Sequence, residues 1–226
     1  MMQSANPKQS PRSLQGLYVV TPDWDDTDKL LEISAAALEA GVCLLQYRHK
    51  TAAAAQRKAQ ATALLALCRR HGVRFIVNDF VDLAQELDAD GVHVGGTDAS
   101  VQEVRALLGP DKIVGASCYG SLELAEKSAA SGASYLALGG FYPSLKKKYP
   151  VTTDPHIVAQ ARASWDLPLV VIGGMTVENS APLVALGAHM VAAISSVYGV
   201  DEASADANRT KQAVLAFHKL WQVATR

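Results

Sequence analysis

The stretch LVVIGGMTVENSAPLVALGAHMVAAISS, residues 169–196, contains one β/α unit and the strand of the next unit. Leu169–Ile172 is short and apolar and is followed by two glycines, whereas Val177–Leu186 is an amphipathic stretch rich in Ala and Leu. Met190–Ile194 is again apolar and is followed by two serines. Apolar runs this short and continuous are typical of parallel strands that are covered on both faces.

The same alternation extends over the rest of the chain. The predicted strands are Leu17–Thr21, Cys43–Tyr47, Arg74–Asn78, Gly91–Val94, Ile113–Ser117, Ser134–Leu138, Leu169–Ile172 and Met190–Ile194. The predicted helices are Asp28–Ala40, Ala52–His71, Val81–Leu87, Val101–Leu108, Leu122–Ser131, Pro155–Ala163, Val177–Leu186 and Arg209–Val223. Strict alternation predicts a parallel sheet with right-handed crossovers. Because eight such units close a sheet into a barrel, the sequence predicts a single (β/α)8 TIM barrel.

One domain accounts for this pattern. An open doubly wound sheet uses the same alternation, but no GxGxxG follows the first strand and nothing marks a boundary between two halves. We therefore expect residues 14–226 to form one TIM-barrel catalytic domain. Residues 1–13 are polar, contain two prolines and lack the apolar core of a signal peptide, so we expect a disordered leader there.

Composition argues against several classes of function. Lys and Arg number 21 and Asp and Glu 22, which leaves a formal net charge of -1 and no overall field to attract nucleic acid or an anionic membrane. No apolar run reaches the ~18 residues of a membrane span. Three scattered cysteines without metal-ligand spacing are typical of a reduced, cytoplasmic protein. The expected partners are small molecules, and the sequence leaves open whether the chain forms a homo-oligomer.

The first cluster of functional groups ends the second predicted strand. In Gln46-Tyr-Arg-His-Lys50, an extended backbone places Gln46, Arg48 and Lys50 on one face, because side chains alternate with period two. One amide and two cations on one face suit a phosphate or diphosphate group. A solvated basic turn before the next helix explains the spacing equally well.

Two aspartates follow the third and fourth strands. Asp79 comes directly after the third strand, and Asp98 lies in Gly95-Gly-Thr-Asp98 after the fourth. Because consecutive strands are neighbours in the barrel, the two carboxylates can hold Mg²⁺ between them and the oxygens of a phosphate. Taken singly, Asp79 is a candidate N-cap and Asp98 an ordinary turn residue. Beside Arg48 and Lys50, a metal site is the better interpretation.

A long loop follows the sixth strand. Residues 139–148 combine two glycines, two aromatic residues and three lysines. This composition favours a mobile flap that covers a ligand and brings cations to it. An exposed charged loop is the alternative interpretation.

Small residues follow the last two strands, Gly173-Gly174 after the seventh and Ser195-Ser196 after the eighth. These loops are the usual phosphate site of TIM barrels, and glycines let backbone N–H groups approach an anion closely. Ser117 directs a hydroxyl at the same mouth, but no triad context makes it a nucleophile. His93 lies within the fourth strand, where filling a core layer is favoured over metal binding. Two anion sites in one barrel mouth predict a condensation of two phosphorylated ligands.

In the order and spacing of these segments, the chain resembles thiamine phosphate synthases from Leu17 to about Val200. The resemblance is carried by Leu17–Thr21, Gln46–Lys50, Asn78-Asp79, Ala89–Gly95, Asp98, Gly115–Ser117, residues 143–147, Ile172–Gly174 and Val191–Ser195. It implies a TIM barrel that joins 4-amino-2-methyl-5-hydroxymethylpyrimidine diphosphate to a thiazole phosphate, giving thiamine phosphate and diphosphate. In the family, Mg²⁺ and basic residues draw off the diphosphate, and the thiazole nitrogen attacks the pyrimidine cation that remains.

The resemblance also implies roles for individual residues. The residues expected to hold the pyrimidine diphosphate are Gln46, Arg48, Lys50, Asn78 and Ser117, with Tyr47 and His49 lining the segment. The expected Mg²⁺ ligands are Asp79 and Asp98. The residues expected around the thiazole phosphate are Ser144, Leu145, Lys146, Gly174, Ile194 and Ser195. The expected catalytic residues are Arg48, Ser117 and Lys147, the last of which reaches the diphosphate.

One segment departs from the family pattern. The family usually has Pro-Thr-x-Thr-Lys in the sixth loop, whereas this chain has Pro143-Ser-Leu-Lys-Lys147, so that Lys146 puts a cation in place of a hydroxyl. Two other functions fit the same barrel. A thiazole tautomerase needs the second anion site but not the Mg²⁺ site, and a non-catalytic sensor of thiamine precursors is favoured only by the altered loop.

Overall fold

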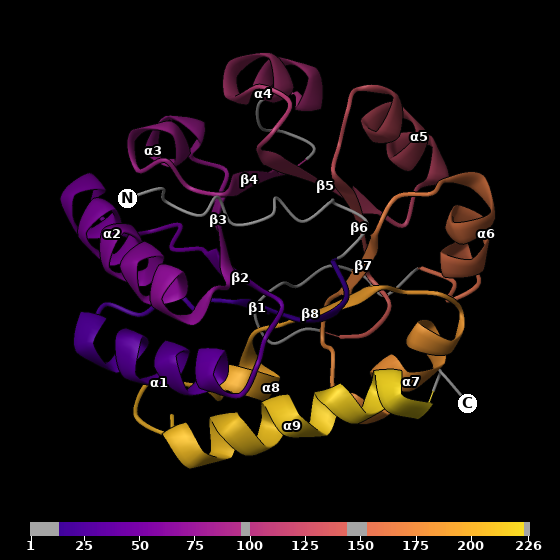
Figure 1. Cartoon of the computed structure of the whole chain (residues 1–226). Coiled ribbons are helices and arrows are strands. Elements are labelled where there is room, and N and C mark those ends of the chain that lie inside the picture. Colours follow the sequence, from indigo (N-terminus) through magenta and orange to yellow (C-terminus); the bar gives the residue numbers. More distant parts are fainter. Residues whose placement is uncertain (1–13, 96–99, 144–152, 224–226) are drawn as a thin grey trace, which may run out of the picture.

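The structure is a computed structural model that describes residues 14–95, 100–143 and 153–223. Within these ranges, parallel strands close into a barrel in the order β1 to β8, and β1 pairs with both β2 and β8 (Figure 1). The strands are β1 (Gly16–Val20), β2 (Leu44–Tyr47), β3 (Arg74–Asn78), β4 (Gly91–Val94), β5 (Ile113–Tyr119), β6 (Tyr135–Gly139), β7 (Leu169–Ile172) and β8 (Met190–Ala193). The predicted TIM barrel is thus confirmed.

Helices surround the barrel on its outside (Figure 1). They are α1 (Thr27–Glu39), α2 (Ala54–His71), α3 (Val81–Glu86), α4 (Val101–Leu108), α5 (Leu122–Ala130), α6 (Ile157–Ser164), α7 (Val177–Ala185), α8 (Ser195–Tyr198) and α9 (Ala207–Val223). Each predicted helix is present with its ends within two residues of the prediction. The short helix α8 was not predicted. None of the helices in the described ranges is long and apolar enough to cross a membrane.

The core has two layers, separated by the sheet. Tyr18 and Val170 belong to the cluster that fills the barrel interior, whereas their neighbours Leu17 and Val171 pack between the sheet and the helices. Both members of each pair are buried. Successive side chains on a strand point to opposite faces, so a strand covered on both faces must be apolar throughout. This double burial explains why the strands appear in the sequence as continuous apolar runs.

Local sequence signals fix several helix ends. Ser100 and Glu103 form a capping box at the start of α4, in which each side chain accepts a hydrogen bond from the other residue's backbone N–H. Gly72 ends α2 with φ 65°, a left-handed conformation that glycine adopts at little cost. These ends set the length of each crossover and thereby deliver the following strand to the barrel. The predicted leader, residues 1–13, lies outside the described residues.

Candidate active site

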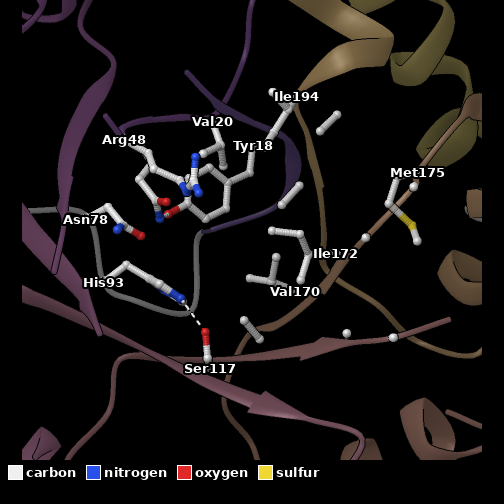
Figure 2. Close-up of a pocket in the computed structure, with 18 of the residues that line it drawn as sticks. Tyr18, Val20, Arg48, Asn78, His93, Ser117, Val170, Ile172, Met175 and Ile194 are labelled. Atoms are coloured by element: carbon white, nitrogen blue, oxygen red, sulfur yellow. Dashed lines mark hydrogen bonds between the residues drawn. The ribbon is translucent and has the colours of Figure 1, made fainter. Parts of the chain in front are cut away.

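A cavity of about 370 Å³ opens at the carboxyl ends of the strands. A volume of this size is within the range of small-molecule sites. Sequence-predicted site residues that line it are Gln46, Arg48, Lys50, Asn78, Asp79, Ser117, Gly174, Ile194 and Ser195. Figure 2 shows Arg48, Asn78 and His93 on one side of this cavity and Ile172, Met175 and Ile194 on the other. The barrel therefore brings described residues from both predicted anion sites to a single cavity.

Arg48 is held in place by the loop that follows β1. Its Nη1 donates to both carboxylate oxygens of Asp23, at 3.0 and 2.8 Å. Its backbone is fixed as well, since Thr21 Oγ1 accepts from the Arg48 N–H and donates to the Arg48 carbonyl oxygen. Asp23 also accepts from the Lys50 N–H at 2.9 Å. A single carboxylate thus aligns the segment that carries both cations.

Electrostatics keep Asp23 ionised in this arrangement. Partial burial alone would raise the pKa of its carboxyl group, but the Lys50 N–H and the Arg48 guanidinium together lower that pKa below its ordinary value. Only Nη1 of Arg48 is used, so in the described part of the chain Nε and Nη2 have no partner. Those N–H groups are available to an anionic ligand. Asp23 was not among the predicted site residues, although its place in the loop that follows β1 was a signal that could have found it.

Tyr47 and His49 lie away from the cavity, on the opposite face of their segment from Arg48. Tyr47 is 1% exposed and its hydroxyl donates to Gln60 Oε1 at 2.9 Å. His49 is 2% exposed, and its Nδ1 accepts from the Ala52 N–H at 3.1 Å. Neither residue lines the cavity, and their predicted place beside the ligand stays a prediction. The same period-two alternation that brings Gln46, Arg48 and Lys50 together directs them elsewhere.

Asp79 directs its carboxylate to the cavity from a strained backbone. Its φ is 62°, in the left-handed region that costs a non-glycine residue free energy. The Asn78 amide donates to Asp79 Oδ2 at 2.6 Å, and Lys50 Nζ lies 3.4 Å from the same oxygen. The alternative role as a helix N-cap is not realised, because Phe80 occupies that position of α3 without a side-chain capping bond.

The residues of this wall fit a Mg²⁺ ion only in part. The described residues contain no group of three or more His, Cys, Asp or Glu side chains placed to hold a metal. Asp79 provides one carboxylate that faces the cavity, while Asp98 lies outside the described residues. Mg²⁺ is commonly held by one or two carboxylates together with substrate phosphates. The donor set therefore fits an ion whose remaining ligands come with the substrate.

The opposite wall is formed by the loops after β7 and β8. Gly173 and Gly174 have φ values of 107° and 64°, and a Cβ on Gly174 would lie 2.2 Å from the Pro143 carbonyl oxygen. Only glycine fits such a close approach of two backbones. Ser195 begins the short helix α8, and Ser196 Oγ donates to the Met175 carbonyl oxygen at 2.7 Å. These glycines and serines line the cavity at the position where TIM barrels commonly bind phosphate.

The loop after β6 is only partly described. Its two ends meet where Thr153 Oγ1 donates to the Gly139 carbonyl oxygen at 2.7 Å. Tyr142 lines the cavity between those ends, and its hydroxyl donates to the Asn179 carbonyl oxygen. The predicted residues Ser144, Leu145, Lys146 and Lys147 lie outside the described residues.

His93 is a core residue, as its place within the fourth predicted strand indicated, and it is also part of the cavity wall. It is 8% exposed inside the barrel. Its Nε2 is hydrogen-bonded to Ser117 Oγ at 2.9 Å (Figure 2), and its Nδ1 to the Tyr135 hydroxyl at 2.9 Å. Tyr18 and Tyr135 were not among the predicted site residues. The floor of the cavity is therefore a buried polar network.

Fold and site together define a TIM-barrel enzyme whose cavity, at the carboxyl ends of the strands, is lined by both polar and apolar side chains. A family model described as thiamine monophosphate synthase matches residues 17–197. The chain belongs to this family, and it is a transferase of thiamine biosynthesis.

Proteins similar to this chain support its membership of the family, and the similarity extends over most of the length of each. The chain is 66% identical over 186 residues to the thiamine-phosphate synthase of Janthinobacterium sp. strain Marseille, covering 82% of this chain and 90% of that protein. It is 48% identical over 197 residues to that of Thiobacillus denitrificans, covering 86% and 93%. Among solved structures, thiamine phosphate pyrophosphorylase from Pyrococcus furiosus superposes with a TM-score of 0.81 at 28% identity, covering 95% and 99%.

Proposed function

We propose that the chain condenses 4-amino-2-methyl-5-hydroxymethylpyrimidine diphosphate with a thiazole phosphate. The bond between the pyrimidine methylene carbon and the diphosphate oxygen breaks, and a bond from that carbon to the thiazole nitrogen forms. The products are thiamine phosphate and diphosphate. The observation that carries this proposal is the placement of Arg48, Lys50 and Asp79 on one wall of a cavity whose opposite wall holds Gly174 and Ser195.

The wall formed by β2 and β3 suits the diphosphate. Arg48 offers its remaining N–H groups and Lys50 a point charge, and both side chains reach the cavity. Asp79 and Asp98 would hold a Mg²⁺ ion, which would supply positive charge beside the phosphate oxygens. We expect Lys147 to add a third cation from the sixth loop. Gathering positive charge where the diphosphate leaves lowers the barrier to its departure.

The wall formed by the loops after β7 and β8 suits the thiazole phosphate. Backbone N–H groups near Gly174 and the hydroxyl of Ser195 would bind its oxygens, with Ile194 beside them. We expect Ser144, Leu145 and Lys146 to close this end. Holding both substrates in one cavity replaces an encounter in solution by a reaction within a complex.

Apolar side chains in the cavity wall protect a dissociative reaction. Val20, Val170 and Ile172 are among the residues that line the cavity (Figure 2). Apolar side chains exclude water, which would otherwise capture the pyrimidine cation left by the departing diphosphate. Gln46, Asn78 and Ser117 provide polar contacts for the pyrimidine ring. No covalent enzyme intermediate is needed, so Arg48, Ser117 and Lys147 act by positioning and by electrostatic stabilisation.

A thiazole tautomerase is the less favoured alternative. It would use the wall after β7 and β8 but would have no need of Arg48, Lys50, Asn78 and Asp79 together at the opposite wall. A sensor would bind the precursors without turnover.

The test is to mix the purified protein with both substrates and to measure diphosphate and thiamine phosphate, first with Mg²⁺ and then with EDTA. We expect equimolar, Mg²⁺-dependent formation of both products and no diphosphate when the thiazole phosphate is left out. Binding of both substrates without any product would contradict the synthase and leave the sensor. Isomerisation of a thiazole substrate in the presence of EDTA would support the tautomerase.

A further inference from the structure

A chain of hydrogen bonds crosses the barrel interior beneath the cavity. Gln46 Nε2 donates to the Tyr18 hydroxyl, and the Tyr18 and Tyr135 hydroxyls lie 2.8 Å apart. The Tyr135 hydroxyl is 2.9 Å from His93 Nδ1, and His93 Nε2 is 2.9 Å from Ser117 Oγ. Gln46 and Ser117, at the two ends, both line the cavity, whereas Tyr135 is fully buried and does not.

Strand register and one glycine make this series of hydrogen bonds possible. His93 pairs with Gly115 across β4 and β5, and Gly115 pairs with Tyr135 across β5 and β6. A Cβ on Gly115 would lie 2.0 Å from the Tyr135 ring, so only glycine leaves room for that ring. The His93 and Tyr135 rings then stack, with centroids 5.7 Å apart and planes 15° apart. The ring of Tyr18 meets Tyr135 edge-on at 5.9 Å.

The donors and acceptors along this chain determine where each proton lies. The Tyr18 oxygen accepts from the Gln46 amide, so its single proton is left for the Tyr135 oxygen. Tyr135 then accepts from Tyr18 and donates its own proton to His93 Nδ1. Because Nδ1 accepts, the neutral imidazole carries its proton on Nε2 and donates it to Ser117 Oγ. Ser117 therefore keeps its own proton for a group in the cavity.

Burial keeps the phenols of Tyr18 and Tyr135 protonated, and the donors and acceptors assigned above require both protons. Removal from water raises the pKa of Tyr18 and of Tyr135 well above the ordinary value for a tyrosine. Both hydroxyls therefore retain one proton near neutral pH, and each acts as one donor and one acceptor.

We propose that Tyr135 is a positioning residue, which holds His93 in its Nε2–H tautomer and thereby makes Ser117 a hydrogen-bond donor to the substrate. Tyr135 touches neither the cavity nor the reacting atoms and acts through His93. The kinetic part of this proposal rests on the proposed function, whereas the tautomer itself does not. If these hydrogen bonds ran in the opposite direction, the Gln46 amide oxygen would have to face Tyr18, and the imidazole proton would be on Nδ1.

The direct test is the tautomer of His93 in the protein without substrate, read from long-range ¹H–¹⁵N correlations of uniformly labelled protein. The chain contains six histidines, so the His93 signals are assigned by their loss in His93→Gln. We expect the Nε2–H tautomer in the wild type. In Tyr135→Phe, which keeps the ring, we expect the Nδ1–H form to appear. An Nδ1–H or doubly protonated His93 in the wild type overturns the proposal even if Tyr135→Phe does not fold.

Tyr18→Phe is the matched control for these spectra. It removes a hydroxyl from the same buried chain but leaves Tyr135 able to donate to His93 Nδ1. We expect His93 to stay in the Nε2–H form in this variant. If both variants change the tautomer to the same extent, general loosening of the core explains the result and the positioning role is refuted.

Kinetics test whether Tyr135 acts through Ser117. We expect Tyr135→Phe to lower kcat about five- to tenfold, the scale of one hydrogen bond between neutral groups, with KM for the thiazole phosphate unchanged. In a Ser117→Ala background, the same substitution is expected to change kcat by less than about twofold, because the two residues form one unit. Equal losses in both backgrounds would contradict the proposal. Altered tautomers with no catalytic effect would overturn its kinetic part alone.

Discussion

The Asp23→Ala substitution tests whether Arg48 depends on a partner to hold its place in the active site. The two side chains are 30% and 12% exposed, and the closest oxygen of Asp23 lies 2.8 Å from Arg48 Nη1. At an effective dielectric constant of about 20, the gross attraction at this distance is about 6 kcal/mol. Desolvation of both charges offsets most of it, so the net loss in the free energy of unfolding is expected to be about 1–3 kcal/mol.

Activity should fall for a related reason. Without Asp23, the Arg48 guanidinium samples other rotamers, and the Lys50 N–H loses its acceptor. Removing a carboxylate from the diphosphate wall also strengthens attraction for an anion, but water at the open mouth screens that gain. We expect the loss of Arg48 orientation to outweigh the stronger attraction for the anion, so that kcat/KM is about tenfold lower in Asp23→Ala. Arg48→Ala should lose at least ~10²-fold, because it removes the group itself.

The assay combines urea unfolding with steady-state rates of diphosphate release. Asp23→Asn is the control, because an amide oxygen can still accept from the Lys50 N–H but carries no charge; it should fall between wild type and Asp23→Ala. Wild-type stability together with wild-type kcat/KM in Asp23→Ala would show that Arg48 keeps its place without Asp23. Tighter diphosphate binding in that variant would show that Asp23 competes with the ligand rather than orienting Arg48.

Three further outcomes are expected. Asp79→Asn should reduce turnover at least ~10²-fold and leave a residual rate that EDTA no longer lowers, as a Mg²⁺ titration would show; a near-normal, Mg²⁺-dependent rate would contradict the metal role. Gly174→Ala should raise KM for the thiazole phosphate and destabilise the fold by more than the ~1–2 kcal/mol of a left-handed residue, because a backbone oxygen lies 2.2 Å from the new Cβ. Gly72→Ala is its control, since φ is 65° with nothing within 4 Å of the added carbon, and it should leave KM unchanged. Burial raises the pKa of Cys68 to about 12 and of Cys118 to about 11, so both thiols should resist alkylation at neutral pH until the protein unfolds, and rapid labelling of the folded enzyme would contradict this.

The fold could be predicted because the barrel strands are buried on both faces. β3, β4 and β7 begin and end at the predicted residues, whereas β5 continues past Ser117 to Tyr119 through a shift in its pairing with β6. Tyr119 has φ 51° there, a conformation that no residue pattern predicts for a tyrosine. The helix α8 was missed because its four residues are too few to show helical periodicity.

The placement of the candidate site residues could be predicted where it depends on a single strand, and it could not be predicted where several strands must align. Period-two alternation along one segment was enough to bring Arg48 and Lys50 to one face. The pairing of Arg48 with Asp23 depends on how the loop after β1 lies beside the end of β2. The contact between His93 and Tyr135 depends on the register of β4, β5 and β6, for which a glycine at position 115 is the main local sign.

A crystal structure of the protein with thiamine phosphate, diphosphate and Mg²⁺ would show whether the two phosphorylated groups bind to opposite walls of the cavity. We expect the diphosphate and the metal to lie against Arg48, Lys50 and Asp79, and the phosphate ester of thiamine phosphate to lie at Gly174 and Ser195. Both phosphorylated groups on one wall, or a diphosphate bound outside the cavity, would contradict this arrangement.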